Sequence, residues 1–226
     1  MYYDAAIEKS SSFSISKVFG WLFMALGITA VTAYGFAYLF LSGLISYEGF
    51  ELIMIIAVVL MIVETFVMQF RVLKNNKSLT VPFVIYSITM GLMLSTFVAI
   101  INPVYIALAF GVTAMLFGVM ALYGYLAKRD LNRMGALAFS LLLGTLIISI
   151  VNIFIASSTI DWIVSFVSFG AIMLFVSFDM WKIKTIAERG YGTSNICLYC
   201  AFQLYVDFIY IFMRVLSFIA RFANNR

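Results

Sequence analysis

The chain has 226 residues, of which 65% are hydrophobic and only 11% are charged. An average soluble domain has roughly 25% charged residues, so a water-soluble fold is excluded, because one core could not bury this much apolar surface. The chain has no histidine, which excludes histidine-ligated metals and the serine–histidine and cysteine–histidine catalytic pairs. The net charge of +4 comes from basic residues between apolar runs, which indicates membrane topology signals rather than a nucleic-acid surface.

Seven apolar runs follow a polar N-terminal segment of residues 1–17. The first run is too long for a signal-peptide core and ends without a cleavage site, so we interpret it as an uncleaved span. The runs cover residues 18–45, 52–73, 79–101, 104–126, 136–157, 160–181 and 194–220. Each can cross a hydrocarbon layer of about 30 Å as a helix, and only helices satisfy their own backbone groups in lipid. We therefore expect an all-α polytopic membrane protein with one membrane domain, residues 18–220, and a short C-terminal tail, residues 221–226.

Basic residues lie in alternate connections between these runs. They are Lys9, Lys17, Arg71, Lys74, Lys77, Lys128, Arg129, Arg133, Lys182, Lys184 and Arg189. The intervening connections contain Glu48, Glu51 and Asp161 and no lysine or arginine. Because positive charge collects on the cytoplasmic side, the N-terminus is predicted to be cytoplasmic.

The seventh run departs from this charge pattern. If it crosses the membrane, Arg214, Arg221 and Arg226 lie on the outer side. A re-entrant segment would return the C-terminus to the cytoplasm, whereas in a full crossing Arg214 could snorkel to the outer surface. We favour the full crossing.

Three acidic residues fall within the apolar runs or at their edges, namely Glu64, Asp179 and Asp207. Each opposes insertion by a few kcal/mol, which makes them candidates for a functional site. Asp179 lies near the predicted cytoplasmic boundary, and Asp207 lies about 18 Å into the seventh run by helical rise. Glu64 is in mid-span, and Arg71 follows it two turns later.

Two neighbouring aspartates would form a site for a proton or a cation. If Asp179 and Asp207 approach within hydrogen-bonding reach, they cannot both ionise cheaply and would share a proton. Without that proton they would attract Arg71 or a hard divalent cation such as Ca²⁺. The simpler interpretation is that Asp179 snorkels to the cytoplasm and Glu64 pairs with a nearby helix.

Two polar features inside the runs have structural interpretations. Cys197 and Cys200 form a C-x-x-C motif without further cysteine or histidine ligands, so we expect both thiols to be packing residues. Asn152 lies inside the fifth run, where we expect its amide to bond to a neighbouring helix.

Several separate motifs, in order along the chain, resemble the Bax inhibitor-1 family. They are GLMLS at residues 91–95, VTA at 112–114, LYGY at 122–125, KRDL at 128–131, SIVNIF at 149–154 and LYVDFI at 204–209, the last followed by Phe212, Arg214 and Leu216. The similarity covers residues from about 17 to 220, and the combination of motifs makes it specific.

The resemblance implies seven membrane helices, the last surrounded by the other six, and a pH-sensitive calcium leak across the membrane. It implies that Asp179 and Asp207 are the pH sensor, and that Glu64 matches a glutamate of the second helix. It also implies a basic residue that engages the sixth-helix aspartate. Arg71 fits this role by residue type, and Lys74 fits the family's spacing better.

Four functions remain open from the sequence. The first is the pH-gated calcium leak, in which Ca²⁺ is cargo held transiently by Asp179 and Asp207, with no permanent cofactor and no enzymatic activity. The others are a non-conducting membrane scaffold, a proton-coupled transporter and an intramembrane aspartyl protease, although the Gly-x-Gly-Asp and Pro-Ala-Leu motifs of that protease class are missing. The expected partners are the lipid bilayer, calcium ions and protons but no nucleic acid, and the expected location is a bacterial plasma membrane.

Overall fold

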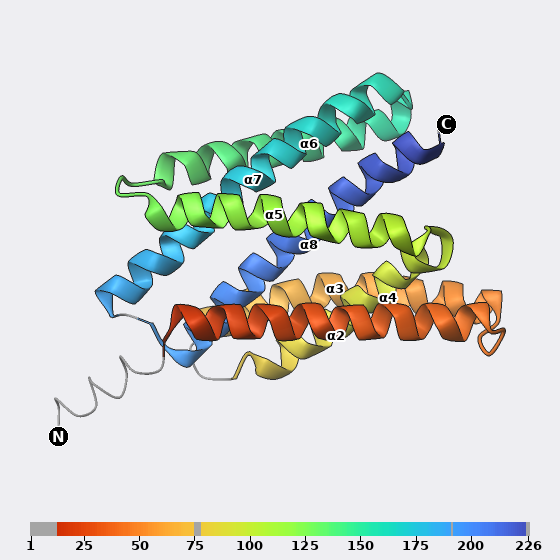
Figure 1. The fold of residues 1–226 in the computed structure, drawn as a ribbon, viewed down its shortest axis with the longest axis horizontal. Coiled ribbons are helices and arrows are strands. Elements are labelled where there is room, and N and C mark those ends of the chain that lie inside the picture. Colours follow the sequence, from red (N-terminus) through yellow and green to blue (C-terminus); the bar gives the residue numbers. More distant parts are fainter. Residues whose placement is uncertain (1–12, 75–77, 191, 225–226) are drawn as a thin grey trace. The chain divides into compact units, whose positions relative to one another are not determined.

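The computed structural model describes residues 13–74, 78–190 and 192–224. These residues form seven helices and no strand: α2 (Ile15–Leu41), α3 (Tyr47–Lys74), α4 (Thr80–Ile100), α5 (Pro103–Leu126), α6 (Asn132–Ile155), α7 (Ser158–Arg189) and α8 (Ser194–Asn224) (Figure 1). All seven are long and apolar enough to cross a membrane. The prediction of an all-α polytopic membrane protein is confirmed.

Helix α2 ends at Leu41, before its apolar run does. Gly43 has a φ of 77°, and its amide donates to the carbonyl of Phe40 at 3.0 Å, while the amide of Leu44 donates to Leu39 at 3.1 Å. This pair of bonds is a Schellman ending, which needs a residue that tolerates positive φ. The turn is therefore set by a glycine inside an apolar stretch, where hydropathy shows no boundary.

Helices α7 and α8 extend beyond their apolar runs. They have 32 and 31 residues, or about 48 and 46 Å by helical rise, against a hydrocarbon layer of about 30 Å. Lys182 and Lys184 therefore lie within α7 rather than in the connection after it, and Arg221 lies in the last turn of α8 rather than in a tail. A re-entrant segment requires a chain reversal, and α8 is one uninterrupted helix, which favours a full crossing.

The helices group into two compact units. The first unit contains Met1–Ile106 and Arg189–Tyr205, and the second contains Ala107–Glu188 and Val206–Arg226. The first unit thus holds α2, α3, α4, the first turn of α5 and the beginning of α8. The second unit holds most of α5, all of α6, nearly all of α7 and the rest of α8.

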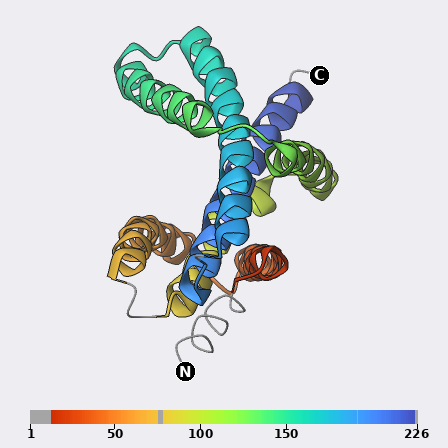
Figure 2. The same cartoon turned by 90° about the vertical axis from the view of Figure 1, so that its left-hand side faces the viewer.

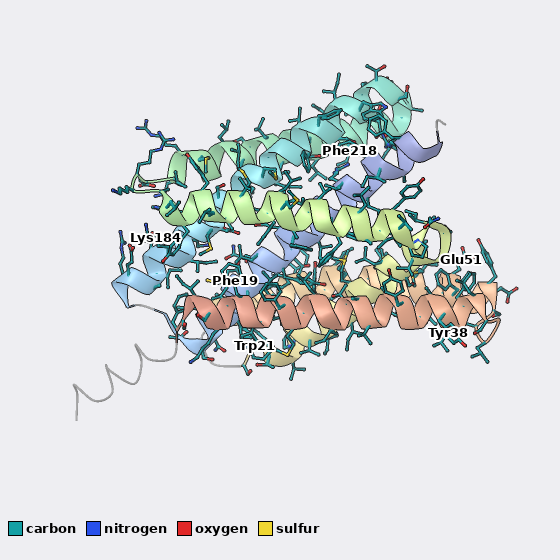
Figure 3. The ribbon with its side chains drawn as sticks, viewed as in Figure 1. Phe19, Trp21, Tyr38, Glu51, Lys184 and Phe218 are labelled. Atoms are coloured by element: carbon teal, nitrogen blue, oxygen red, sulfur yellow. The ribbon has the colours of Figure 1, made fainter. Side chains whose placement is uncertain are left out.

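In the first unit, α4 contacts both α2 and α3 and lies between them in the end-on view (Figure 2). Gly91 makes the close approach of α4 to α2 possible, because a Cβ there would lie 2.7 Å from the carbonyl oxygen of Thr29. Close to the connection between α2 and α3, Phe50 of α3 packs against Phe40 of α2, with ring centroids 4.3 Å apart. Figure 3 shows Glu51 of α3 close to the end of α2 that carries Tyr38.

The beginning of α8 is fixed in the first unit by Tyr205, a fully buried side chain. Its ring packs edge-on against Phe83 of α4, with centroids 5.7 Å apart. Its hydroxyl lies 2.6 Å from the hydroxyl of Thr29. Thr29 has a single hydroxyl proton, which is directed to the carbonyls of Ala25 and Ser87 at 2.9 and 3.0 Å, so Tyr205 is the donor to Thr29.

In the second unit, small residues bring α7 close to α5 and α6. A Cβ on Gly124 would overlap the backbone carbonyl of Ser177, and the Ser177 hydroxyl donates to the carbonyl of Met120 at 3.0 Å. On the α6 side, Gly135 leaves room for the ring of Phe178. The residues that surround Asp179 on α7 are therefore held from two directions.

Candidate proton and cation site

Asp179 and Asp207 both belong to the second unit, on α7 and α8. Asp179 is 4% exposed. The Asp207 residue is only half-buried, but its Oδ2 atom is fully buried. The two carboxyls lie close enough to interact electrostatically, and Lys182, one turn further along α7, also acts on Asp179. The structure thus brings the two predicted aspartates together within one unit.

The position of each aspartate follows from the helix that carries it. On α7, Val176, Met180 and Ile183 are buried, and this spacing places Asp179 on the inward-facing stripe of the helix. On α8, Asp207 precedes Phe208, whose ring packs between Phe110 and Phe117 of α5. Ordinary apolar packing on both sides therefore carries the two acids into the protein interior.

Each carboxyl has one oxygen that the described residues do not satisfy. Asp179 Oδ1 and Asp207 Oδ2 are buried and have no hydrogen-bond partner in this part of the chain. An unsatisfied buried polar atom costs roughly 1–3 kcal/mol, and a buried charge costs more. Two such groups in electrostatic contact can lower this cost by sharing a proton or by receiving a cation.

Glu64 belongs to the first unit, whereas the aspartates belong to the second. It is 7% exposed, and Thr89 of α4 lies beside its carboxyl. The Thr89 hydroxyl also donates to the carbonyl of Ile85 at 3.0 Å. Within the described ranges, Glu64 Oε2 has no hydrogen-bond partner, so this residue is a second buried acid with unused bonding capacity.

The counter-charge remains a prediction. Arg71, at the end of α3, donates to the carbonyl of Ser78 at 3.2 Å, and both residues belong to the first unit. The side chain of Lys74 lies outside the described residues. The contact of Arg71 with Ser78 does not test an interaction with Asp179.

Asp179 and Asp207 offer a small set of ligands for a metal ion. In the portion of the chain with described coordinates, no three histidine, cysteine, aspartate or glutamate residues group together. Ca²⁺ takes six to eight oxygen ligands, and Asp179 and Asp207 supply two carboxyls. Two carboxyls supply at most four oxygen ligands, which is fewer than Ca²⁺ takes.

The arginines of α8 have partners on α7 that the sequence did not reveal. Arg221 forms a salt bridge with Asp161 at 2.9 Å, and its guanidinium lies 5.2 Å from the ring centroid of Trp162. Arg214 donates to the hydroxyl of Ser165 at 3.4 Å. These pairs depend on the antiparallel contact of α7 with α8. The same contact stacks Trp162 against Phe218 of α8, which Figure 3 labels. No spacing along the chain predicts them.

Comparison with known proteins agrees with this fold. The family model described as "Inhibitor of apoptosis-promoting Bax1" matches residues 12–224. The inner membrane protein YbhL of Escherichia coli (strain K12) is 31% identical over 94% of this chain and 92% of its own length. An uncharacterized protein of Rickettsia prowazekii is 33% identical over 67% of this chain and 64% of its own length. An uncharacterized membrane protein of Streptococcus pyogenes serotype M1 is 27% identical over 91% of each chain. With a family match across nearly its whole length and seven membrane-length helices, this chain is a multi-pass membrane protein that belongs to the Bax inhibitor-1 family.

Proposed function

We propose that this protein is a passive, pH-dependent leak pathway for cations, calcium among them, in a bacterial plasma membrane. The observation that carries the proposal is the Asp179–Asp207 pair, two electrostatically interacting carboxyls on α7 and α8 that each have an unsatisfied buried oxygen. The membrane assignment is supported by the relative in Escherichia coli, whose name describes an inner membrane protein.

The gate is the shared proton. While the pair holds it, one carboxyl O–H donates to the other carboxylate and ties α7 to α8. Loss of the proton leaves two like charges in a poorly solvated place, which repel each other and attract a hard divalent cation. Lys182 offsets part of the charge of Asp179. The leak is therefore expected to rise as the pH rises.

The other predicted residues have supporting roles in this proposal. Arg71 or Lys74 supplies the counter-charge for the deprotonated pair. Glu64 is a pathway residue, and its buried, unsatisfied Oε2 supports this role because a passing cation would give that oxygen a partner. Calcium is cargo throughout, and no enzymatic step is involved.

Calcium uptake by liposomes that contain the purified protein and a calcium dye tests the gate. We expect the uptake rate to increase between about pH 6 and pH 8 and the pH dependence to disappear in Asp207→Asn and Asp179→Asn, because neither variant can share an acidic proton. Asp130→Asn is the matched control, since Asp130 is an exposed acid of the same unit. The proposal would be contradicted if the uptake rate did not change with pH, or if Asp207→Asn took up calcium as the unchanged protein does.

The same preparation separates the alternatives. Calcium uptake against its own gradient, driven by an imposed proton gradient, would identify a proton-coupled transporter. Cleavage of a reporter helix that requires both aspartates would identify a protease. Absence of any leak, with a normal cellular phenotype after both aspartates are replaced, would favour a scaffold.

A further inference from the structure

Thr113 of α5 is a buried hydroxyl that the proposed gate does not use. It is 0% exposed, and its Oγ1 has no hydrogen-bond partner in the described part of the chain. Threonines in helices normally donate to the carbonyl one turn earlier. Five threonines of this protein make this bond, at 2.8 to 3.0 Å: Thr29, Thr32, Thr65, Thr89 and Thr185. Thr113 therefore departs from the pattern that these five threonines follow.

The packing of α5 on α8 places Thr113 at the level of Asp207. The ring centroids of Phe110 and Phe117 each lie 5.5 Å from that of Phe208. Thr113 lies one turn after Phe110 and one turn before Phe117, so it shares their stripe on α5 and faces α8 at the height of Phe208. Asp207 directly precedes Phe208, which is a difference in height of about 1.5 Å along α8.

Two unsatisfied polar atoms thus lie at the same level on neighbouring helices of one unit, the Thr113 hydroxyl and Asp207 Oδ2. A buried water typically makes about three hydrogen bonds to groups that are otherwise unsatisfied. We propose that Thr113 and Asp207 hold a water molecule between them, and that Thr113 is a positioning residue of the pathway that hydrates the cation as it passes Asp207. The second part of this inference rests on the proposed leak function, and the first part does not.

The test uses three variants of the full chain. Thr113→Val removes the hydroxyl and keeps the shape, Thr113→Ser keeps the hydroxyl, and Thr145→Val is the matched control. Thr145 is also a buried threonine of the second unit, but its hydroxyl donates to the carbonyl of Leu142 at 2.9 Å. Calcium uptake into dye-loaded liposomes at high pH and thermal unfolding in detergent are measured for each variant.

We expect Thr113→Val to reduce uptake about tenfold, the effect of one lost hydrogen bond. Thr113→Ser and Thr145→Val should stay within about twofold of the unchanged protein, since each keeps the proposed water contact. If the hydroxyl holds water, Thr113→Val should also lower Tm by about 2–4 °C, and Thr113→Ser should restore it. A dry, unsatisfied hydroxyl predicts the opposite, because replacing it with a methyl group removes a desolvation cost and raises Tm.

A raised Tm in Thr113→Val overturns the proposal, whatever the uptake. If Thr113→Val takes up calcium as fast as the unchanged protein, Thr113 has no role in the pathway. If Thr113→Ser reduces calcium uptake as much as Thr113→Val does, the packing of the side chain matters and its hydroxyl does not. If the unchanged protein itself takes up no calcium, the proposed function fails. The unfolding measurements then still decide whether Thr113 holds water.

Discussion

Tyr205 shows how a single polar side chain can fix a helix in an apolar interior. Its hydroxyl donates to Thr29 of α2 at 2.6 Å, while its ring packs edge-on against Phe83 of α4. Hydrogen bonds between membrane helices contribute only about 0.6 to 2 kcal/mol, because the separated helices also find partners. The contact is therefore of moderate strength, but it specifies which face of α8 turns toward α2 and α4.

Tyr205→Phe is expected to lower the free energy of unfolding by about 0.6 to 2 kcal/mol, because it removes the donor to Thr29 and keeps the ring. Tyr210→Phe on the same helix is the control, since Tyr210 is 55% exposed. Thermal or denaturant unfolding of the two variants in the same detergent checks the difference. Equal stabilities would show that the Tyr205 hydroxyl contributes nothing.

The sequence identified the buried acids, but it could not identify what surrounds them. A carboxyl in an apolar run is visible from composition alone, which is how Glu64, Asp179 and Asp207 were found. The partner of a polar side chain depends on which helices meet. Asn152 was expected to bond to a neighbouring helix, and this was wrong. Its amide instead accepts from the N–H of Ser157 at 3.1 Å and donates to the carbonyl of Ser157 at 3.2 Å, which closes the turn between α6 and α7.

Helix pairs in the second unit approach closely where a glycine faces a neighbour's backbone. Small residues at such positions are a general means of packing membrane helices, because no hydrophobic force acts between helices in lipid. A Cβ on Gly124 would overlap the carbonyl of Ser177 on α7, whereas Gly118 on the same helix has nothing within 4 Å of its Cβ position. Gly124 is thus required for the close contact of α5 with α7, whereas Gly118 is not required by any neighbouring group.

Gly124→Ala and Gly118→Ala should therefore have opposite effects. The first forces α5 and α7 apart and should destabilise the protein by about 1–3 kcal/mol. The second relieves the backbone entropy of glycine and should stabilise it by up to about 1 kcal/mol. Thermal unfolding of both variants tests the pair, and destabilisation of equal size by both would show that the α5–α7 contact is looser than described.

The presence of a helix in each apolar run was easier to predict than the residues at which the helices begin and end. All seven apolar runs contain a helix, because each run must satisfy its backbone inside lipid. The ends depend on features without a hydropathy signal. Gly43 stops α2 within an apolar stretch, and α7 continues to Arg189 through charged residues that remain good helix formers.

At the scale of the whole molecule, the Asp161–Arg221 salt bridge joins the start of α7 to the end of α8. Both side chains are partly exposed, so the bridge contributes little stability. It does show that the start of α7 lies beside the end of α8. Arg221 and Arg214 of α8 thus have Asp161 and Ser165 of α7 as their partners.

Reporter fusions test this topology. We expect a reporter inserted in the connection between α5 and α6 to be cytoplasmic, because that connection carries Lys128 and Arg129. If α8 crosses completely, as its uninterrupted helix favours, a reporter fused after α8 should lie on the opposite side. Both reporters on the same side would mean that α8 does not cross.

The division of the chain into two units has no counterpart in the pattern of hydropathy or charge along the chain. Composition is uniform from α2 to α8, and the connections are short, so residues 18–220 look like a single domain. The grouping depends on contacts between distant segments, such as Tyr205 with Thr29 and Phe208 with Phe110. Such pairings are set by side-chain shape at each interface rather than by hydropathy.

The length of α7 has a mechanical consequence. A helix of 32 residues is longer than the hydrocarbon layer of a bilayer, so part of α7 extends beyond that layer unless the helix tilts strongly. Glu188 and Arg189, in its last turn, are both exposed. Asp179 lies about 15 Å back along the same stiff rod. Because an α-helix is stiff, a partner bound to this exposed end would be coupled through the helix to Asp179, which is itself only 4% exposed.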